Sequence, residues 1–385
     1  MRAERKKSMN NYLSNVDAFG DTHIDGECRY ASQRRRKNAV KASSRCHIGI
    51  VVYQLIAMAV LLIVEFGLFI LLPEYAAVRV INSPYYLWVM QVLAMYVIAF
   101  PIFHLMTKGI PTRRAEKKDI TLGEFTVVFM IAQGLAVVGS IISTVLTDLI
   151  EGTTNTPIED TTSQIISSSP LWLIILVVVI IGPIIEELMF RKIFIDKLSV
   201  YGDRLAIIVS GVAFGFMHGN LYQLFYAVAI GILFGYVYVK TRKIICTCLL
   251  HIMVNFFGSV PGLLMEPAFN YLTELETLYP DGVGMSAADM LTSVDALVGV
   301  YSYLFLQYGL AIAGIVLLIV LSVKKAYKVP DSCEYRLPKK TVPRVAFFNL
   351  GAIIFFIWSA IFIILTIFPN ALNILLNRLI EAIGA

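Results

Sequence analysis

The sequence predicts an all-α fold, a polytopic transmembrane bundle of about eight or nine helices. Two observations of composition indicate it: 58% of the 385 residues are hydrophobic and only 15% are charged, a smaller charged share than soluble globular proteins have. The apolar residues also gather in runs of bilayer-spanning length, and a lone strand cannot satisfy its backbone hydrogen bonds in lipid. The lipid bilayer is therefore an expected partner.

Residues 1–47 are polar and basic, and we expect a disordered cytoplasmic tail lying against anionic lipid head groups. The run Arg34-Arg35-Arg36-Lys37 has no interleaved aromatic residues, so no nucleic-acid partner is expected. No apolar core precedes residue 48, which argues against a cleavable signal peptide.

The transmembrane domain is expected over 48–368. Its nine apolar segments lie at roughly 48–72, 85–106, 124–147, 170–190, 204–218, 222–239, 244–264, 299–323 and 345–368. Most reach the ~20 residues that cross a bilayer as a helix. Segment 204–218 gives only about 21 Å of helix, so it must be buried and tilted or must end inside the membrane at Gly219-Asn220.

The cations alternate from loop to loop. Four loops carry several Lys or Arg residues: 107–123, 191–204, 240–243 and 324–344. Three loops carry one cation at most: 73–84, 148–169 and 265–298. The positive-inside rule then predicts a cytoplasmic N-terminus, nine crossings and an external C-terminus. Residues 369–385 are expected to form an interfacial helix, and the pattern favours an integral protein of a bacterial plasma membrane.

Two adjacent glutamates end one apolar segment. Glu187 and Arg191 are four residues apart, in the favourable order for an ion pair on a helix. Glu186 points ~100° away and has no partner in its own helix, which leaves it able to accept and return protons. Gly182-Pro183 just upstream should free a backbone carbonyl. The alternative is that both glutamates merely cap a helix end at the surface.

Two further motifs place polar groups in neighbouring apolar segments. His218 follows Phe214 by four residues, and Asn255 follows His251 by four, so each pair shares a helical face. A single histidine in such a helix usually serves as an interhelical hydrogen-bond partner. Because short loops join the four helices of 170–264, these helices should pack together around a common interior. One carboxylate, two imidazoles and an amide suit hydrolysis by activated water.

Three motifs follow one another along the chain: E-E-L-M-F-R (186–191), F-G-F-M-H (214–218) and H-I-M-V-N (251–255). Together, in this order, they resemble the CPBP family, also called the Abi family. This family contains type II CAAX prenyl proteases and bacteriocin-processing or immunity proteins. The resemblance covers about 170–260. It implies an intramembrane endopeptidase with its catalytic core in 170–264 and a site that opens to the cytoplasmic side.

The resemblance also implies the role of each residue. Glu186 would activate water with help from His218, while His251 and Asn255 would hold the oxyanion. The implied supporting residues are Glu187, Arg191 and Phe214. If a metal such as zinc is present, the implied ligands are Glu186, His218 and His251, although the soluble zincin signature is absent. A metal-free glutamate mechanism is equally compatible.

The implied substrate is a peptide or a lipidated or membrane protein. A non-catalytic immunity or scaffold protein of the same fold is the main alternative. A transporter with a glutamate–histidine proton relay is less well supported, because the two halves show no inverted repeat. The sequence does not determine the oligomeric state.

Overall fold

The computed structural model describes residues 26–368 apart from 114–115, 155–156, 159, 281–283, 327–328 and 330–336, and the side chains from residue 33 onward. The described part is helical and has no strand, which confirms the predicted fold class. Eight of its helices are long and apolar enough to cross a membrane: Gln33–Leu71, Pro84–Thr107, Leu122–Thr154, Leu171–Leu198, Leu221–Thr241, Ile244–Leu278, Ala287–Val323 and Leu350–Ile367. The chain is an integral membrane protein.

The first long helix is α2 (Gly26–Leu71), and it corrects the predicted tail. The sequence predicted disorder through residue 47, whereas the structure has helix from residue 26 onward; residues 1–25 lie outside the described part. One face of this helix is buried at helical spacing, by Ala39, Ala42, Ser43, Cys46 and His47. Small and polar residues make this face, so hydropathy did not reveal it.

Short helices complete the first half of the bundle. They are α3 (Glu74–Ile81), α4 (Pro84–Gln91), the π-helix η1 (Val92–Ala99), α5 (Phe100–Thr107) and α7 (Thr161–Ser167). Between them lies the long helix α6 (Leu122–Thr154), which packs against α12 and α14.

The helix that carries the glutamates is wound irregularly. It runs through α8 (Leu171–Leu173), η2 (Ile174–Ile181), α9 (Gly182–Glu187), η3 (Leu188–Ile195) and α10 (Asp196–Leu198), where η2 and η3 have π-helical hydrogen bonds. Such π-turns occur frequently at functional sites.

The core continues as α11 (Asp203–Met217), α12 (Leu221–Thr241) and α13 (Ile244–Leu278). At 15 residues, α11 is the short segment that the sequence singled out. It is largely buried, and it ends at the predicted break, where Gly219 has φ +65° and the Asn220 side chain caps α12. The short helix is therefore enclosed by protein.

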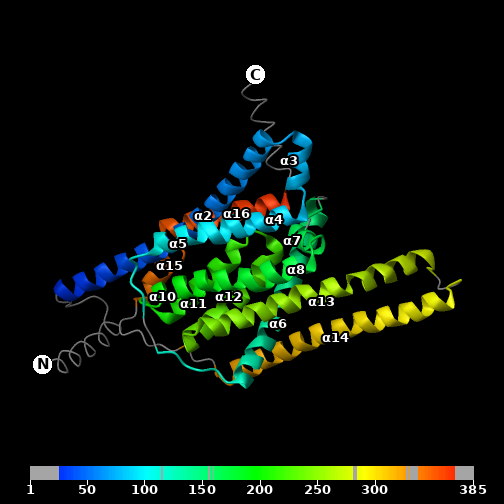
Figure 1. Cartoon of the computed structure of the whole chain (residues 1–385). Coiled ribbons are helices and arrows are strands. Elements are labelled where there is room, and N and C mark those ends of the chain that lie inside the picture. Colours follow the sequence, from blue (N-terminus) through cyan, green and yellow to red (C-terminus); the bar gives the residue numbers. More distant parts are fainter. Residues whose placement is uncertain are drawn as a thin grey trace.

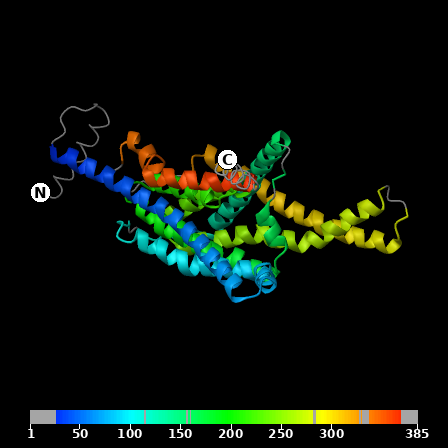
Figure 2. The same ribbon diagram turned by 90° about the horizontal axis from the view of Figure 1, so that it is seen from above.

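The last helices are α14 (Ala287–Val323), η4 (Lys339–Thr341), α15 (Val342–Ala346) and α16 (Leu350–Ile367). In Figures 1 and 2, α16 lies beside α2, and α13 and α14 project together beyond the rest of the bundle. Most of 265–298, expected as a loop, is thus helix. The predicted interfacial helix at 369–385 lies outside the described residues.

Candidate active site

The helix that leads to Glu186 has one carbonyl that lacks its backbone donor, as Gly182-Pro183 predicted. The N–H of Gly182 bonds to the Val177 carbonyl, five residues back. The next bond of this series would run from residue 183 to Val178, but proline has no N–H. Asn255 Nδ2 donates to the Val178 carbonyl instead, at 2.9 Å. The winding of this helix and the position of Asn255 are therefore linked.

Glu187 is fully buried and contacts two partners. Its Oε2 lies 3.1 Å from Arg191 Nε, which is the predicted i,i+4 ion pair. Its Oε1 lies 3.1 Å from His251 Nδ1. Because a carboxylate can only accept, this contact places the proton on Nδ1 and turns the Nε2 of His251 away from Glu187.

Glu186 is on the other side of the same imidazole. Its Oε2 lies 3.8 Å from His251 Nε2, longer than a hydrogen bond, and its side chain is 22% exposed. No Lys or Arg among the described residues forms an ion pair with it. The two glutamates therefore differ as the helix geometry predicted: Glu187 is paired with a cation and Glu186 is not.

His218 lies at the C-terminal end of α11. Its Nδ1 is 2.8 Å from the Phe214 carbonyl, which can only accept, so the proton again lies on Nδ1. The Phe214 ring makes edge contacts with both imidazoles, at 4.9 Å from His218 and 5.6 Å from His251 between centroids. The Arg191 guanidinium lies 5.0 Å from the same ring. Phe214 thus joins the three motifs.

A cavity of about 300 Å³ brings the candidate side chains together. Glu186, His218, His251 and Asn255 all line it. Other polar side chains line it as well, namely Gln91, Tyr96, Thr162, Gln223 and Tyr226. Gln91 Nε2 donates to the Tyr96 hydroxyl at 3.3 Å. The rest of the cavity lining is mainly apolar.

The cavity extends away from the cation-rich end of the bundle. Its remaining lining includes Leu87 and Trp88 of α4, which follows the cation-poor loop 73–84, and Ile165 and Ile166 of α7, which lies within the cation-poor segment 148–169. The expectation of a site opening to the cytoplasmic side is therefore not what the lining residues indicate.

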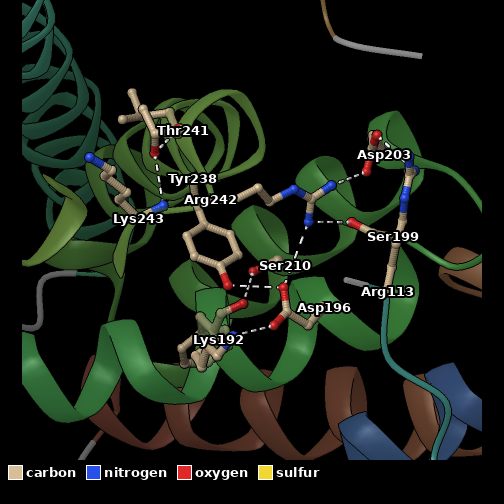
Figure 3. Close-up of polar contacts among 12 residues, drawn as sticks. Arg113, Lys192, Asp196, Ser199, Asp203, Ser210, Tyr238, Thr241, Arg242 and Lys243 are labelled. Atoms are coloured by element: carbon tan, nitrogen blue, oxygen red, sulfur yellow. Dashed lines mark hydrogen bonds and ion pairs between the residues drawn. The ribbon is translucent and has the colours of Figure 1, made fainter. Parts of the chain in front are cut away.

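Buried ion pairs join the loops at the cation-rich end (Figure 3). Arg242 Nη2 lies 2.6 Å from Asp203 Oδ1 and its Nη1 lies 3.6 Å from Asp196 Oδ1. Arg113 also pairs with Asp203, at 3.1 Å. Tyr238 donates to Asp196 at 2.9 Å. Three of the four cation-rich loops therefore meet, as the alternation of charge requires.

The implied metal ligands do not form a metal site in this arrangement. No three His, Cys, Asp or Glu side chains of the described residues are grouped so that they could hold a metal ion. The Nδ1 atoms of both histidines are engaged by Glu187 and by the Phe214 carbonyl. Glu186, His218 and His251 share a cavity without the close convergence that zinc needs.

Sequence reasoning missed three contributions. The bond from His251 to Glu187 was missed because Arg191 already satisfied the carboxylate. Tyr96 gave no signal among 19 tyrosines. Gln54 of α2 donates to the Met217 carbonyl at 2.7 Å and accepts from Trp358 at 2.9 Å, which fixes the helix end beside His218. The signal in the sequence that could have indicated Gln54 is a polar amide within an apolar segment.

In a comparison with known protein families, residues 168–257 match the family model "Type II CAAX prenyl endopeptidase Rce1-like". The predicted resemblance is confirmed. The Rce1-like segment contains all four candidate residues. A putative membrane peptidase, YdiL of Bacillus subtilis, is 35% identical over 115 residues, 30% of this chain and 46% of YdiL.

A second relative of the Rce1-like segment is the membrane-embedded CAAX protease MroQ of Staphylococcus aureus. It is 29% identical over 141 residues, 35% of this chain and 56% of MroQ. The chain thus matches about half the length of these curated relatives. No solved structure matches.

Proposed function

We propose that this protein is an intramembrane endopeptidase in which Glu186 activates the water that cleaves a peptide bond. The observation that carries the proposal is the position of Glu186. Its carboxylate faces the cavity, lacks a cationic partner among the described residues and lies beside His251 Nε2. The peptidase names of the relatives support the same reaction class.

The reaction would proceed by general base catalysis. Glu186 takes a proton from water while the water oxygen attacks the carbonyl carbon, and the carbonyl π electrons move to oxygen. When the C–N bond breaks, the nitrogen takes the proton from Glu186, so water and peptide become a carboxylic acid and an amine. His218 Nε2 has no hydrogen-bond partner among the described residues and carries a lone pair that can orient the water.

Asn255 would stabilise the oxyanion. Its Nδ2 has two hydrogens, and the Val178 carbonyl takes only one of them. The second can donate to the developing negative charge, with His251 beside it. A donor fixed before the reaction costs no reorganisation, and removing such a donor typically slows catalysis by about 100- to 1,000-fold. The side chain is held by its hydrogen bond to the Val178 carbonyl, which Pro183 leaves without a backbone donor.

The proposed substrate is a peptide or a lipidated or membrane protein segment, because the cavity lies within a bundle of membrane helices. We propose that the side chains of the site activate water without a metal, since they do not converge as ligands. Glu187 and Arg191 would then be positioning residues for His251.

Comparative peptidomics of cells that produce the wild type or Glu186→Gln tests the proposal. A precursor should accumulate in the mutant, and the purified wild type in liposomes should cleave a peptide spanning that precursor's processing site. Glu186→Gln should lose at least about 100-fold in rate, as removal of a catalytic proton acceptor predicts. Lys192→Met, at an exposed position of the same helix, is the matched control.

Equal peptide pools and an unchanged phenotype in Glu186→Gln and His251→Ala would contradict the proposal. That result would instead support a non-catalytic immunity or scaffold protein, which needs the fold and not the carboxylate.

A further inference from the structure

We propose that the substrate reaches Glu186 from the cation-poor end of the bundle, through a mouth formed by Leu87 and Trp88 of α4 and Ile165 and Ile166 of α7. The substrate would accordingly be an extracytoplasmic peptide segment with apolar side chains next to the scissile bond. This inference rests on the proposed endopeptidase function, and it adds the side of access and the class of substrate.

The cation-rich end is closed beneath the site. The ion pairs of Arg242 with Asp196 and Asp203 are buried, with side chains at most 8% exposed. Large side chains fill the space between these ion pairs and the motif helices; Phe190, Phe194 and Tyr238 are at most 1% exposed. None of these six side chains lines the cavity. A peptide arriving from this end would have to break charge pairs in the protein interior, which is costly.

The opposite end has an accessible rim. Leu87 is 42% exposed although it lines the cavity, and Thr162, Ile165 and Ile166 of α7 are partly exposed. One hydrogen bond closes one side of the rim: Trp88 Nε1 donates to Ser169 Oγ at 2.8 Å. The mouth thus consists of one turn of α7 against Leu87 and Trp88 of α4, with no buried ion pair among its described residues.

The charge pattern assigns this mouth to the outer side of the membrane. The mouth helices α4 and α7 lie next to or within 73–84 and 148–169, which together contain one cation, Arg79. The loops at the closed end contain the clustered Lys and Arg residues. The positive-inside rule places cation-rich loops in the cytoplasm, so the mouth faces outward.

The chemistry of the rim indicates what it would accept. Leu87, Trp88, Ile165 and Ile166 offer apolar surface, and none of them carries charge. An apolar side chain of the substrate would be buried here while its backbone carbonyl extends toward Glu186.

Thiol labelling in intact cells tests the side of access. In a chain whose five cysteines are replaced by alanine, Leu87→Cys and Ile165→Cys should react with a membrane-impermeant maleimide added outside. Lys192→Cys, which is 56% exposed at the closed end, should react only after permeabilisation. Labelling of Lys192→Cys from outside, with the mouth positions protected, would overturn the assignment.

Activity of the labelled chains tests the route. A bulky maleimide adduct on Leu87→Cys or Ile165→Cys should reduce cleavage of an internally quenched peptide at least tenfold relative to the same unlabelled variant. An adduct on Thr277→Cys, exposed on the projecting part of α13, should leave cleavage unchanged. Full activity of both labelled mouth variants would refute the route.

The two proposals can fail separately. If wild type and Glu186→Gln both lack activity, the endopeptidase proposal fails, and the labelling pattern still reports which end is open. If the wild type cleaves and the mouth adducts have no effect, only the route fails.

Discussion

Glu187 lies between His251 and Arg191, 3.1 Å from each, with one carboxylate oxygen toward either partner. The carboxylate thus orients an imidazole of the cavity and neutralises a fully buried guanidinium. Glu187→Gln should lower the free energy of unfolding by about 3–5 kcal/mol, because it leaves Arg191 buried without its counter-charge. Thermal unfolding of the purified protein in detergent measures this loss.

Lys192, an exposed residue of the same helix that pairs with the buried Asp196, supplies the control for Glu187→Gln. Lys192→Met should cost no more than about 1 kcal/mol, because Lys192 is 56% exposed and Asp196 keeps Arg242 and Tyr238 as partners. Equal losses in the two variants would mean that Glu187 is not the ionic centre of the site.

Pro183 and Asn255 act on the same carbonyl. Asn255→Leu should cost about 1–3 kcal/mol, because it leaves the Val178 carbonyl unsatisfied in the protein interior. Pro183→Ala restores an N–H that can reach this carbonyl, so it should recover stability in the double variant without recovering peptide cleavage. A double-mutant cycle measured by unfolding and by cleavage rate checks both parts. Strictly additive stabilities would contradict the shared carbonyl.

Gly182 leaves room for the Tyr96 hydroxyl. A Cβ at this position would lie 3.1 Å from that hydroxyl and 3.0 Å from the Val177 carbonyl. Gly182→Ala should therefore displace Tyr96 within the cavity and slow cleavage by up to about 100-fold, the effect of a misplacement near 1 Å. Stability should change by less than about 1 kcal/mol, since alanine favours helix.

Gly258→Ala is the matched control for Gly182→Ala, because nothing lies within 4 Å of its added Cβ. The measurement is the cleavage rate of the two purified variants. Equal rates would show that the space between Gly182 and the Tyr96 hydroxyl has no role in cleavage.

Gln54 connects the outer helices to His218. Gln54→Leu frees the Met217 carbonyl, so it should cost about 1–3 kcal/mol and also lower the cleavage rate through movement of His218. Trp358→Phe removes only the bond to Gln54 Oε1 and should have the smaller effect on rate. A larger loss of cleavage in Trp358→Phe would contradict this order.

The bilayer explains why so much of the fold could be predicted. Lipid allows only helices for isolated spans, so hydropathy identified the long helices, and the i,i+4 rule identified the pair Glu187–Arg191. Helix α11 also ended at the predicted break. The buried face that begins at Ala39 was missed, because its small and polar residues pack against protein and not lipid.

The fine geometry of the site depended on contacts between distant segments. Glu187 and His251 are 64 residues apart, and no local spacing indicates that one holds the other. The π-helical winding of η2 and η3 is likewise unmarked in the sequence, apart from the proline that follows η2. The motif residues do not indicate where the cavity opens, because this depends on how α4 and α7 pack against them.

The buried ion pairs at the closed end have a consequence for biosynthesis. Arg113 and Arg242 are separated by 129 positions, yet both pair with Asp203, so this cluster cannot be completed until the ribosome has made five of the long helices. While the chain is being inserted and Asp203 is not yet in place, the positive charges of these arginines keep their loops on the cytoplasmic side of the membrane. Once Asp203 has paired with both, the same charges fasten the finished helices together. A nascent chain truncated before residue 242 should therefore already be oriented in the membrane, but it lacks the Arg242–Asp203 ion pair that joins its loops.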